Sequence, residues 1–136
     1  MKYQAVDIRS VWDQVRPAII DIHKKMPWSD WRPEDIYAAC LSGQAAIFTQ
    51  GDTEASKSFC VIRVDTCEQT GDKSLFIWIA WSPDEPGANA VFKDVDKMAL
   101  DSGCKSIDFI TGSQKLVKYA EKFGYKKVMY EVRKEL

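Results

Sequence analysis

The stretch that decides the fold is LFIWIAW (residues 75–81), followed by SPDEPGAN (82–89) and AVFKDVDKMALDSG (90–103). Seven consecutive apolar residues between two turn-forming dipeptides fit a strand buried on both faces and are too few for a helix of ordinary length. After the loop, apolar residues recur at helical spacing, and Gly103 stands where that helix would end. The stretch therefore predicts a strand, a loop and a helix, an arrangement that can hold a phosphate on backbone N–H groups.

The chain before this stretch predicts one strand, two helices and two more strands. The first strand covers Lys2–Val6, and Asp7 can cap the helix that follows. Pro17 lies inside that helix and predicts a kink or break near Arg16, because proline removes a backbone hydrogen bond. Pro33 marks the first turn of a second, short helix.

The rest of the chain predicts a mixed sheet. Three strands joined by turns form an antiparallel meander, and the later strand–helix–strand passage makes two strands parallel. We therefore predict one α+β (mixed α/β) domain over residues 1–136, with element order β-α-α-β-β-β-α-β-α-β and helices on both faces. The predicted elements after the second helix are the strands Gln44–Gln50 and Ser58–Asp65, the strand Leu75–Trp81 with its helix, the strand Lys105–Ile110, the helix Ser113–Phe123 and the strand Tyr125–Arg133.

Composition excludes several classes of function. The 136 residues include 19 basic and 20 acidic side chains, so no net field favours nucleic acid or an anionic membrane. Four cysteines without a Cys-x-x-Cys pair, and a single histidine, do not form a typical metal-ligand set. No apolar run approaches the ~20 residues of a membrane span, and the N-terminus lacks an apolar signal core. We expect a soluble, cytoplasmic protein with reduced thiols.

The order of elements, together with the closing segment KYAEKFGYKKV (118–128), resembles the GCN5-related N-acetyltransferase (GNAT) superfamily over nearly the whole chain. Members commonly end with a helix that carries an Ala-x-x-x-Tyr-Glu-Lys-x-Gly-Phe-like pattern, which Glu121, Lys122, Gly124 and Tyr125 match. The resemblance implies acetyl-CoA as the cofactor and a small amine as the acceptor.

The family's phosphate-binding motif is similar to the end of the apolar strand and the loop after it. Members carry a pattern like Val-x-Pro-x-x-Arg/Gln-Gly-x-Gly-x-Gly/Ala, whose backbone amides hold the pyrophosphate of acetyl-CoA. WSPDEPGANAV (81–91) keeps its proline at residue 83 and its first glycine at residue 87. The residues that the resemblance assigns to cofactor binding are Ile79, Trp81, Gly87, Ala88, Asn89, Ala90 and Val91.

The same loop departs from the motif in ways that have physical costs. Pro86 has no N–H to donate, and Val91 tolerates poorly the positive φ that a glycine adopts. Asn89 can visit that region more readily. Asp84 and Glu85 add negative charge beside an anion site. These departures predict a degenerate acyl-CoA loop.

The catalytic acid and base are also unusual. Many family members protonate the leaving thiolate with a tyrosine that aligns here with Ala120, so Tyr119 or Tyr125 would have to substitute, unless both are ordinary packing residues. A base could be Asp108, if burial raised its pKa, or a water. Asp108 is equally compatible with a solvated position on a strand.

Two functions remain open at this point. WRPEDIYAACLSGQAAIF (31–48), followed by LFIWIAW, is similar to small phage-encoded proteins of N-acetyltransferase-like fold, some of them head-assembly proteins. We expect a phage-type binding or head-assembly accessory protein, virion-associated and acting on a protein partner. The alternative is an acetyl-CoA-dependent N-acetyltransferase that moves an acetyl group to an amine. Candidates for a contact surface or a cleft rim are Trp28, Trp31, Trp78 and Trp81.

Overall fold

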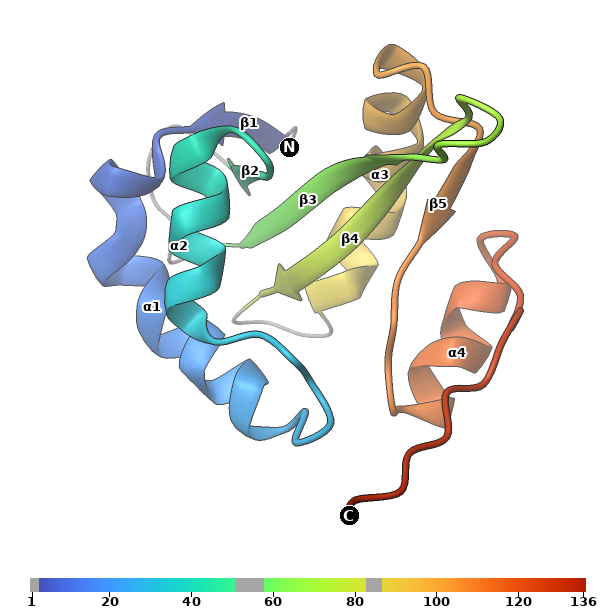
Figure 1. Cartoon of the computed structure of the whole chain (residues 1–136). Helices are drawn as coiled ribbons and strands as arrows, with labels where there is room; N and C mark the ends of the chain where they lie inside the picture. Colours follow the sequence, from blue (N-terminus) through green and yellow to red (C-terminus); the bar gives the residue numbers. More distant parts are fainter. Residues whose placement is uncertain (1–2, 51–57, 83–86) are drawn as a thin grey trace.

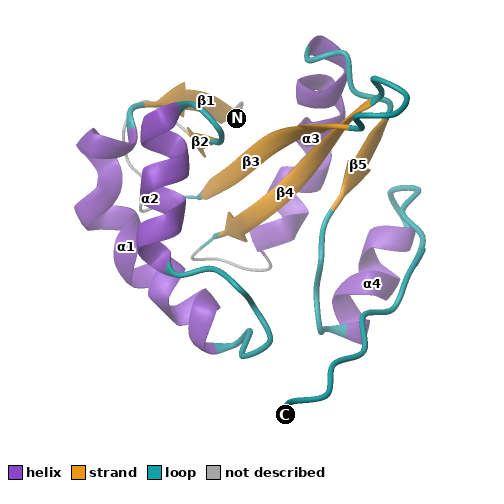
Figure 2. Ribbon diagram, viewed as in Figure 1, coloured by secondary structure: helices purple, strands orange, loops and turns teal. Residues whose placement is uncertain are grey.

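The strands form one mixed sheet with helices on both faces (Figures 1 and 2). The structure is a computed structural model that describes residues 3–50, 58–82 and 87–136. Its elements, in chain order, are β1 (Tyr3–Val6), α1 (Ile8–Lys24), α2 (Pro33–Ser42), β2 (Ala46–Gln50), β3 (Phe59–Thr66), β4 (Lys73–Trp81), α3 (Gly87–Asp101), β5 (Ser106–Asp108) and α4 (Gln114–Glu121).

The sheet has the order β1-β2-β3-β4-β5. The first four strands pair antiparallel in sequence, and β5 pairs with β4 in parallel after the α3 crossover. The predicted α+β class, the meander and the parallel pair are therefore confirmed. The apolar run predicted as a central strand is the interior strand β4, hydrogen-bonded on one edge to β3 and on the other to β5.

The two faces of the sheet pack into two hydrophobic cores. One core joins the sheet to α1 and α2 and includes Ile79, which is 2% exposed. The other joins it to α3 and α4 and includes Leu75, which is fully buried. Each such side chain contributes roughly 1.5–3 kcal/mol through removal from water. Both cores use β4, which explains why its sequence is a continuous apolar run.

A β-bulge interrupts the pairing of β3 and β4. Val61 lies opposite Ile79 and the next residue, Ile62, lies opposite Ile77, so Trp78 has no partner of its own. As a result Trp78 and Ile79, although adjacent in sequence, both pack toward the core of α1 and α2. The bulge places a tryptophan on the open part of this face.

Local sequence signals set the helix ends. The Asp7 side chain accepts a hydrogen bond from the backbone N–H two residues later and caps α1. Pro33 opens α2, and Gly43, with φ of 84°, closes it in the left-handed conformation that favours glycine. Ser113 caps α4 by accepting from a backbone N–H at 3.2 Å. The predicted cap at Asp7 and the predicted helix start at Pro33 are confirmed.

Of the kink or break predicted near Arg16, the break is wrong, because α1 continues through Pro17, while the kink stays a prediction. Pro17 is on the exposed side of the helix, while Val15 and Ile19 on either side of it are fully buried. Burial of these neighbours holds the helix together across the missing hydrogen bond. No helix in the described ranges has the length and apolar character needed to cross a bilayer.

The last predicted strand, Tyr125–Arg133, is also wrong, since the chain after Gly124 contains no helix or strand. A strand needs a partner as well as a favourable sequence, and the sheet ends at β5. The C-terminal segment is instead tied by Arg133, whose guanidinium donates to the carbonyl oxygen of Trp28 at 3.1 Å and to the Asp30 carboxylate at 3.3 Å.

Candidate functional site

The sheet opens between β4 and β5. In this parallel pair Ser74 lies opposite Ser106, Leu75 opposite Ile107 and Phe76 opposite Asp108. Strand β5 ends at Asp108. β4 runs on to Trp81, so within the described part of the chain no strand pairs with its carboxyl end on the β5 side. In Figure 1, strand β4 and the segment that follows β5 separate beyond this point. The carboxyl end of β4 is thus exposed along one edge.

The N-terminus of α3 lies just beyond that end of β4. α3 begins at Gly87, and its first turn contains no acidic residue. The first N–H groups of a helix have no intrahelical partner and carry the positive end of the helix dipole. Phosphate groups such as those of acetyl-CoA suit this environment. The departures predicted at Asp84, Glu85 and Pro86 lie outside the described residues.

One predicted obstacle to phosphate binding is wrong. Val91 lies within α3, where φ is negative, so the position does not require the freedom of a glycine. Its side chain is fully buried in the core beneath α3. Gly87, Ala88, Asn89 and Ala90 form the first turn of the same helix, and their assignment to cofactor binding stays a prediction.

The other two predicted cofactor residues lie on β4 itself. The Ile79 side chain is 2% exposed in the core, and the Trp81 ring packs 5.6 Å from the ring of Phe59. Both side chains are packed against other residues, so neither extends into the opening beside β5. Their contribution to a ligand is restricted to the backbone of the β4 edge.

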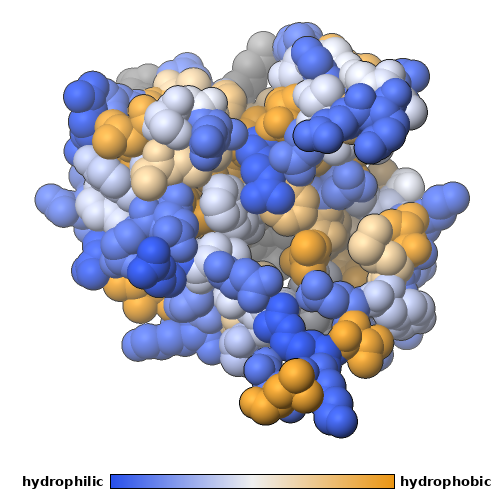
Figure 3. All heavy atoms as spheres, viewed as in Figure 1, coloured by the Kyte–Doolittle hydropathy of each residue, from blue (hydrophilic) through white to orange (hydrophobic). Residues whose placement is uncertain are grey.

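An aromatic cluster with an arginine covers part of the open face of the sheet. The Arg63 guanidinium lies 4.5 Å from the ring centre of Phe76 and 5.0 Å from that of Trp78. Trp31, from the α1–α2 connection, meets Trp78 edge-on at 6.3 Å. Arg63 also donates from Nε to Asp65 at 3.0 Å. Figure 3 shows this face hollowed between the side of α1 and α2 and the side of α4.

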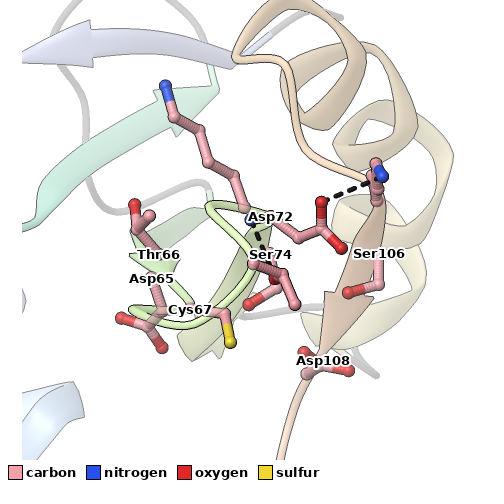
Figure 4. A pocket seen from close by; sticks show the side chains of 10 residues that line it. Asp65, Thr66, Cys67, Asp72, Ser74, Ser106 and Asp108 are labelled. Atoms are coloured by element: carbon pink, nitrogen blue, oxygen red, sulfur yellow. Dashed lines mark hydrogen bonds and ion pairs between the residues drawn. The ribbon is translucent and has the colours of Figure 1, made fainter.

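Asp108 lies on the same face as Phe76, because the two residues are register partners in a parallel pair. It lines an open polar pocket of about 450 Å³ at the β3–β4 turn (Figure 4). In that pocket Lys105 pairs with Asp72 at 2.9 Å and lowers the pKa of that carboxyl. Among the residues that the structure describes, no cation pairs with Asp108. The pocket is lined by Asp65, Thr66, Cys67, Thr70, Asp72, Lys73, Ser74, Lys105, Ser106 and Asp108.

The environment of Asp108 differs from the one expected for a buried base. Its side chain is exposed, so the burial that would strengthen it as a base is absent. An exposed carboxylate can still accept a proton directly or through a water. Its place at the last β4–β5 pair, where the sheet opens, keeps it the best-placed base candidate among the described residues.

The predicted acids, Tyr119 and Tyr125, pack in the core beneath α3 and α4. The Phe92 ring stacks with Tyr119 at 6.3 Å and lies 5.0 Å from Tyr125. Burial first, and then the charges of Asp96 and Asp108, raise the pKa of Tyr125 above its ordinary value. Tyr125 therefore holds its proton firmly, and the structure does not bring either tyrosine onto the face that carries the aromatic cluster.

The connection between α1 and α2 closes the far end of the opening. The Trp28 ring lies against Gly112 so closely that a Cβ there would be 2.6 Å from the Cη2 atom of Trp28. This contact borders a second open pocket of about 420 Å³. Trp28 thus lines this second pocket, whereas Trp31 packs against the core of α1 and α2, and their role as a cleft rim stays a prediction. The sequence analysis did not identify Arg63 and Phe76 as site residues. The only sequence feature that could have indicated them is that each alternates with buried residues along its strand, β3 or β4.

Comparisons with known proteins identify the architecture. No protein-family model and no curated protein matches the sequence. A substituted form of the BH1408 protein from Bacillus halodurans matches with a TM-score of 0.75 and 11% identity over 100% of this chain and 99% of that chain. A Trypanosoma brucei acetyltransferase matches with a TM-score of 0.68 and 13% identity over 99% of both chains.

An aminoglycoside acetyltransferase, meta-AAC0020, from an uncultured soil metagenomic sample, solved in complex with sisomicin, has a TM-score of 0.68 and 8% identity over 99% of this chain and 95% of that chain. The chain has the GNAT fold. Because these identities are low, the GNAT likeness establishes the fold alone. The opening beside β4 and the N-terminus of α3 are features of this fold. Ligand binding there by this chain has to be tested on its own residues.

Proposed function

We propose that this GNAT-fold chain binds an acyl-CoA at the carboxyl end of β4 and transfers its acyl group to an amine that approaches over the open face. The observation that carries the proposal is the end of β4–β5 pairing at Asp108, which leaves the edge of β4 unpaired on that side among the described residues, near the first turn of α3. The helical conformation of Val91 supports it further, because it removes one of the predicted objections to cofactor binding.

In this proposal each part of the site has its own role in binding or proton transfer. Acetyl-CoA, when bound, supplies a thioester carbonyl that an amine nitrogen can attack. The first-turn amides of α3 hold phosphate oxygens, and the free edge of β4 offers backbone donors and acceptors along an extended ligand. Asp108, directly or through a water, accepts the proton that the acceptor's ammonium group loses. A new N–C bond forms as the C–S bond breaks, and the thiolate takes a proton from solvent.

The open face suits an acceptor that combines a positive charge with an apolar body. Asp65 and Asp108 contribute negative charge, of which Arg63 neutralises one unit. The rings of Phe76 and Trp78 offer apolar contact beside them. An amine carried on an aromatic or aliphatic body matches this combination.

Binding is tested by thermal unfolding with acetyl-CoA. Ligand at 100 times its dissociation constant adds about 2.7 kcal/mol to the stability of the native state. We expect Gly87→Asp to abolish this stabilisation, because it places a negative charge at the phosphate end of α3. An aspartate at a helix N-terminus is favourable for the unliganded helix, so the loss cannot be attributed to unfolding. The matched control, Ser102→Asp just after α3, should keep the full shift.

Transfer is tested by release of free thiol with a panel of amines. Asp108→Asn should lower the rate by roughly 10²-fold, the lower end for loss of a general base, while the acetyl-CoA thermal shift is retained. Asp101→Asn, which removes an exposed carboxylate paired with Lys97 on α3, serves as the control. A thermal shift without any thiol release would leave binding and refute transfer. No shift at millimolar acetyl-CoA would refute both.

A second candidate, a GNAT-fold binding module without catalysis, rests on the acid position. Ala120, which aligns with the family's tyrosine, is 1% exposed in the core, and neither Tyr119 nor Tyr125 replaces it on the open face. We infer that such a chain would act through a protein partner, in phage head assembly if its resemblance to phage proteins holds. It predicts neither an acetyl-CoA thermal shift nor thiol release, and co-sedimentation of the chain with head proteins would test the assembly role.

A further inference from the structure

Three side chains on neighbouring strands form a row across the open face of the sheet. Arg63 on β3 lies opposite Phe76 on β4, and Phe76 lies opposite Asp108 on β5. Register partners present their side chains on the same face of a sheet. Because neighbouring strands are about 4.8 Å apart, the backbones of Arg63 and Asp108 are about 10 Å apart, with Phe76 between them. A cation, an apolar ring and an anion therefore follow one another across this face.

Arg63 is held in place but keeps part of its hydrogen-bonding capacity. Its guanidinium lies 4.5 Å from the ring centre of Phe76 and 5.0 Å from that of Trp78, so the group leans over β4, toward the side of β5. Its Nε donates to Asp65 at 3.0 Å. Within residues 3–50, 58–82 and 87–136, no group accepts a hydrogen bond from its terminal nitrogens, Nη1 and Nη2. The outer edge of the guanidinium is thus available to a ligand.

This edge of Arg63 suits a carboxylate. Its N–H donors lie in one rigid plane and match the two oxygens of a carboxylate, which gives a stronger and more directional contact than a point charge does. The two rings hold the guanidinium before a ligand arrives, so less entropy is lost on binding. Asp65 and Asp108 on the same face repel a doubly charged phosphate more than a singly charged carboxylate.

The next row of the same face leaves room for a ligand. Ser74 lies opposite Asp65 on one side and opposite Ser106 on the other. These short side chains and Asp108 line the open pocket of about 450 Å³ that Figure 4 shows. A larger apolar residue at either serine would cover the sheet beside Phe76. The row of charges therefore borders an open space rather than a packed surface.

We propose that the acceptor is a free α-amino acid with an apolar or aromatic side chain. Its carboxylate binds Arg63, its amine faces Asp108, and its side chain packs on the rings of Phe76 and Trp78. Lys105 pairs with Asp72, and among the described residues no cation pairs with Asp108, so this carboxylate is available to an ammonium group. The inference rests on the proposed acyl transfer, but recognition of the carboxylate can be tested separately from it.

The arrangement fits the transfer step. An α-amino acid carries its amine and its carboxylate on one carbon, so the two groups can reach opposite sides of the Phe76 ring at once. The amine nitrogen attacks the thioester carbonyl, the N–C bond forms and the C–S bond breaks. The ammonium group loses two protons on becoming an amide. One passes to Asp108 and then to solvent, and the thiolate takes up the other through solvent. The products are an N-acylamino acid and free CoA.

The first test compares acceptors that differ only in the carboxylate. Phenylalanine is paired with phenethylamine and leucine with isoamylamine, and thiol release gives kcat and KM for each. We expect kcat/KM to be roughly 10- to 100-fold higher for the amino acid of each pair, the range for hydrogen bonds between charged groups. Arg63→Gln should remove this preference by raising KM for phenylalanine, with phenethylamine unchanged, because the contact is equal in ground and transition states. Arg63→Lys keeps the charge without the planar donors and should fall between the two.

A matched control and a binding measurement complete the design. Arg16→Gln removes an exposed arginine on α1, 3.8 Å from Glu34, and should leave both acceptors unaffected. Isothermal titration calorimetry with free CoA in place of acetyl-CoA measures binding without transfer. We expect phenylalanine to bind more tightly than phenethylamine, and Arg63→Gln to remove the difference. Thermal unfolding verifies that each variant is folded.

The outcomes separate this inference from the proposed transfer. If phenylalanine binds through Arg63 but no amine releases thiol, transfer fails and the carboxylate site stands. If phenethylamine reacts as well as phenylalanine, or if Arg63→Gln slows both alike, transfer stands and the carboxylate site is refuted. Absence of thiol release together with absence of binding at millimolar amino acid refutes both.

Discussion

The hydroxyl group of Tyr125 allows a stringent test of the packing beneath α3 and α4. It is buried and has no hydrogen-bond partner among the described residues. Leaving a buried donor unsatisfied costs about 1–3 kcal/mol. Tyr125→Phe removes only that oxygen and keeps the ring contacts with Phe92 at 5.0 Å and Phe109 at 5.5 Å. We therefore expect the variant to be more stable by about 1 kcal/mol, or roughly 4 °C in Tm for a domain of this size.

A matched substitution should have the opposite sign. The Tyr3 hydroxyl hydrogen-bonds the Ser58 hydroxyl, and Ser58 is 1% exposed. Tyr3→Phe removes this bond and leaves the serine hydroxyl buried without a partner, at a cost of about 1–3 kcal/mol. The same chemical change is thus predicted to stabilise the chain at Tyr125 and to destabilise it at Tyr3.

The effect at Tyr125 should grow at high pH. Burial and the charges of Asp96 and Asp108 raise the pKa of Tyr125 in the folded chain. In the unfolded chain a tyrosine loses its proton above about pH 10, so above that pH the unfolded state binds fewer protons and the free energy of unfolding falls. At pH 11 this loss is about 1.4 kcal/mol, and it is absent from Tyr125→Phe. The difference between the two proteins should therefore increase from about 1 to about 2.4 kcal/mol.

Urea denaturation followed by far-UV circular dichroism, at pH 7 and pH 11, measures both effects. Unchanged m-values would show that the midpoints report stability alone. If Tyr125→Phe were destabilised by more than about 1 kcal/mol at pH 7, the hydroxyl must have a partner and the reasoning fails. It fails equally if the difference between the proteins does not change with pH.

Three further outcomes follow from the structure. Gly112→Ala should cost about 1–3 kcal/mol in urea denaturation, because its Cβ would clash with the Trp28 ring at 2.6 Å, and a Trp28→Ala background should relieve that cost. Pro17→Ala should raise stability by about 2 kcal/mol, since it restores a hydrogen bond inside a continuous helix, and an unchanged Tm would contradict this. Iodoacetamide should alkylate Cys67 first in peptide mapping, because hydrogen bonds from Thr70 lower the pKa of that exposed thiol, whereas burial raises the pKa of Cys60 to about 12.

The sequence predicted the sheet well because its strongest signals are local. A continuous apolar run can be buried on both faces only in an interior strand, and β4 is such a strand. Gly43 and Gly124, with φ of 84° and 90°, end helices where glycine is needed. The bulge at Trp78 could not be predicted, because it depends on how Val61 and Ile62 of β3 pair with β4. The contact of Arg63 with Phe76 joins register partners on β3 and β4, so it was missed because the pairing of these two strands was not predicted residue by residue.

The wrong predictions share a cause, which is that local pattern does not specify a partner. The pattern of residues 125–133 predicted a strand, but no strand forms there, because no described segment pairs with it. At Val91 the family motif suggested a loop, whereas the apolar spacing of residues 91, 95 and 99 already indicated a helix facing the core. The helix forms because burial of its apolar face contributes more free energy than the conformational preference of a single loop residue.

The acid position shows how packing constrains any chemistry at this site. Ala120 belongs to the core that also contains Phe92, and a tyrosine there would overfill a site that is 1% exposed. Tyr119 is one residue earlier in α4, so its side chain is rotated by ~100° about the helix axis relative to that of Ala120. It packs against Phe92 and Phe123. Neither position 119 nor position 120 can therefore deliver a proton to a leaving group on the open face, where solvent can supply it instead. The hollowed, open face of the sheet allows that access, so transfer and a missing acid are compatible in this chain.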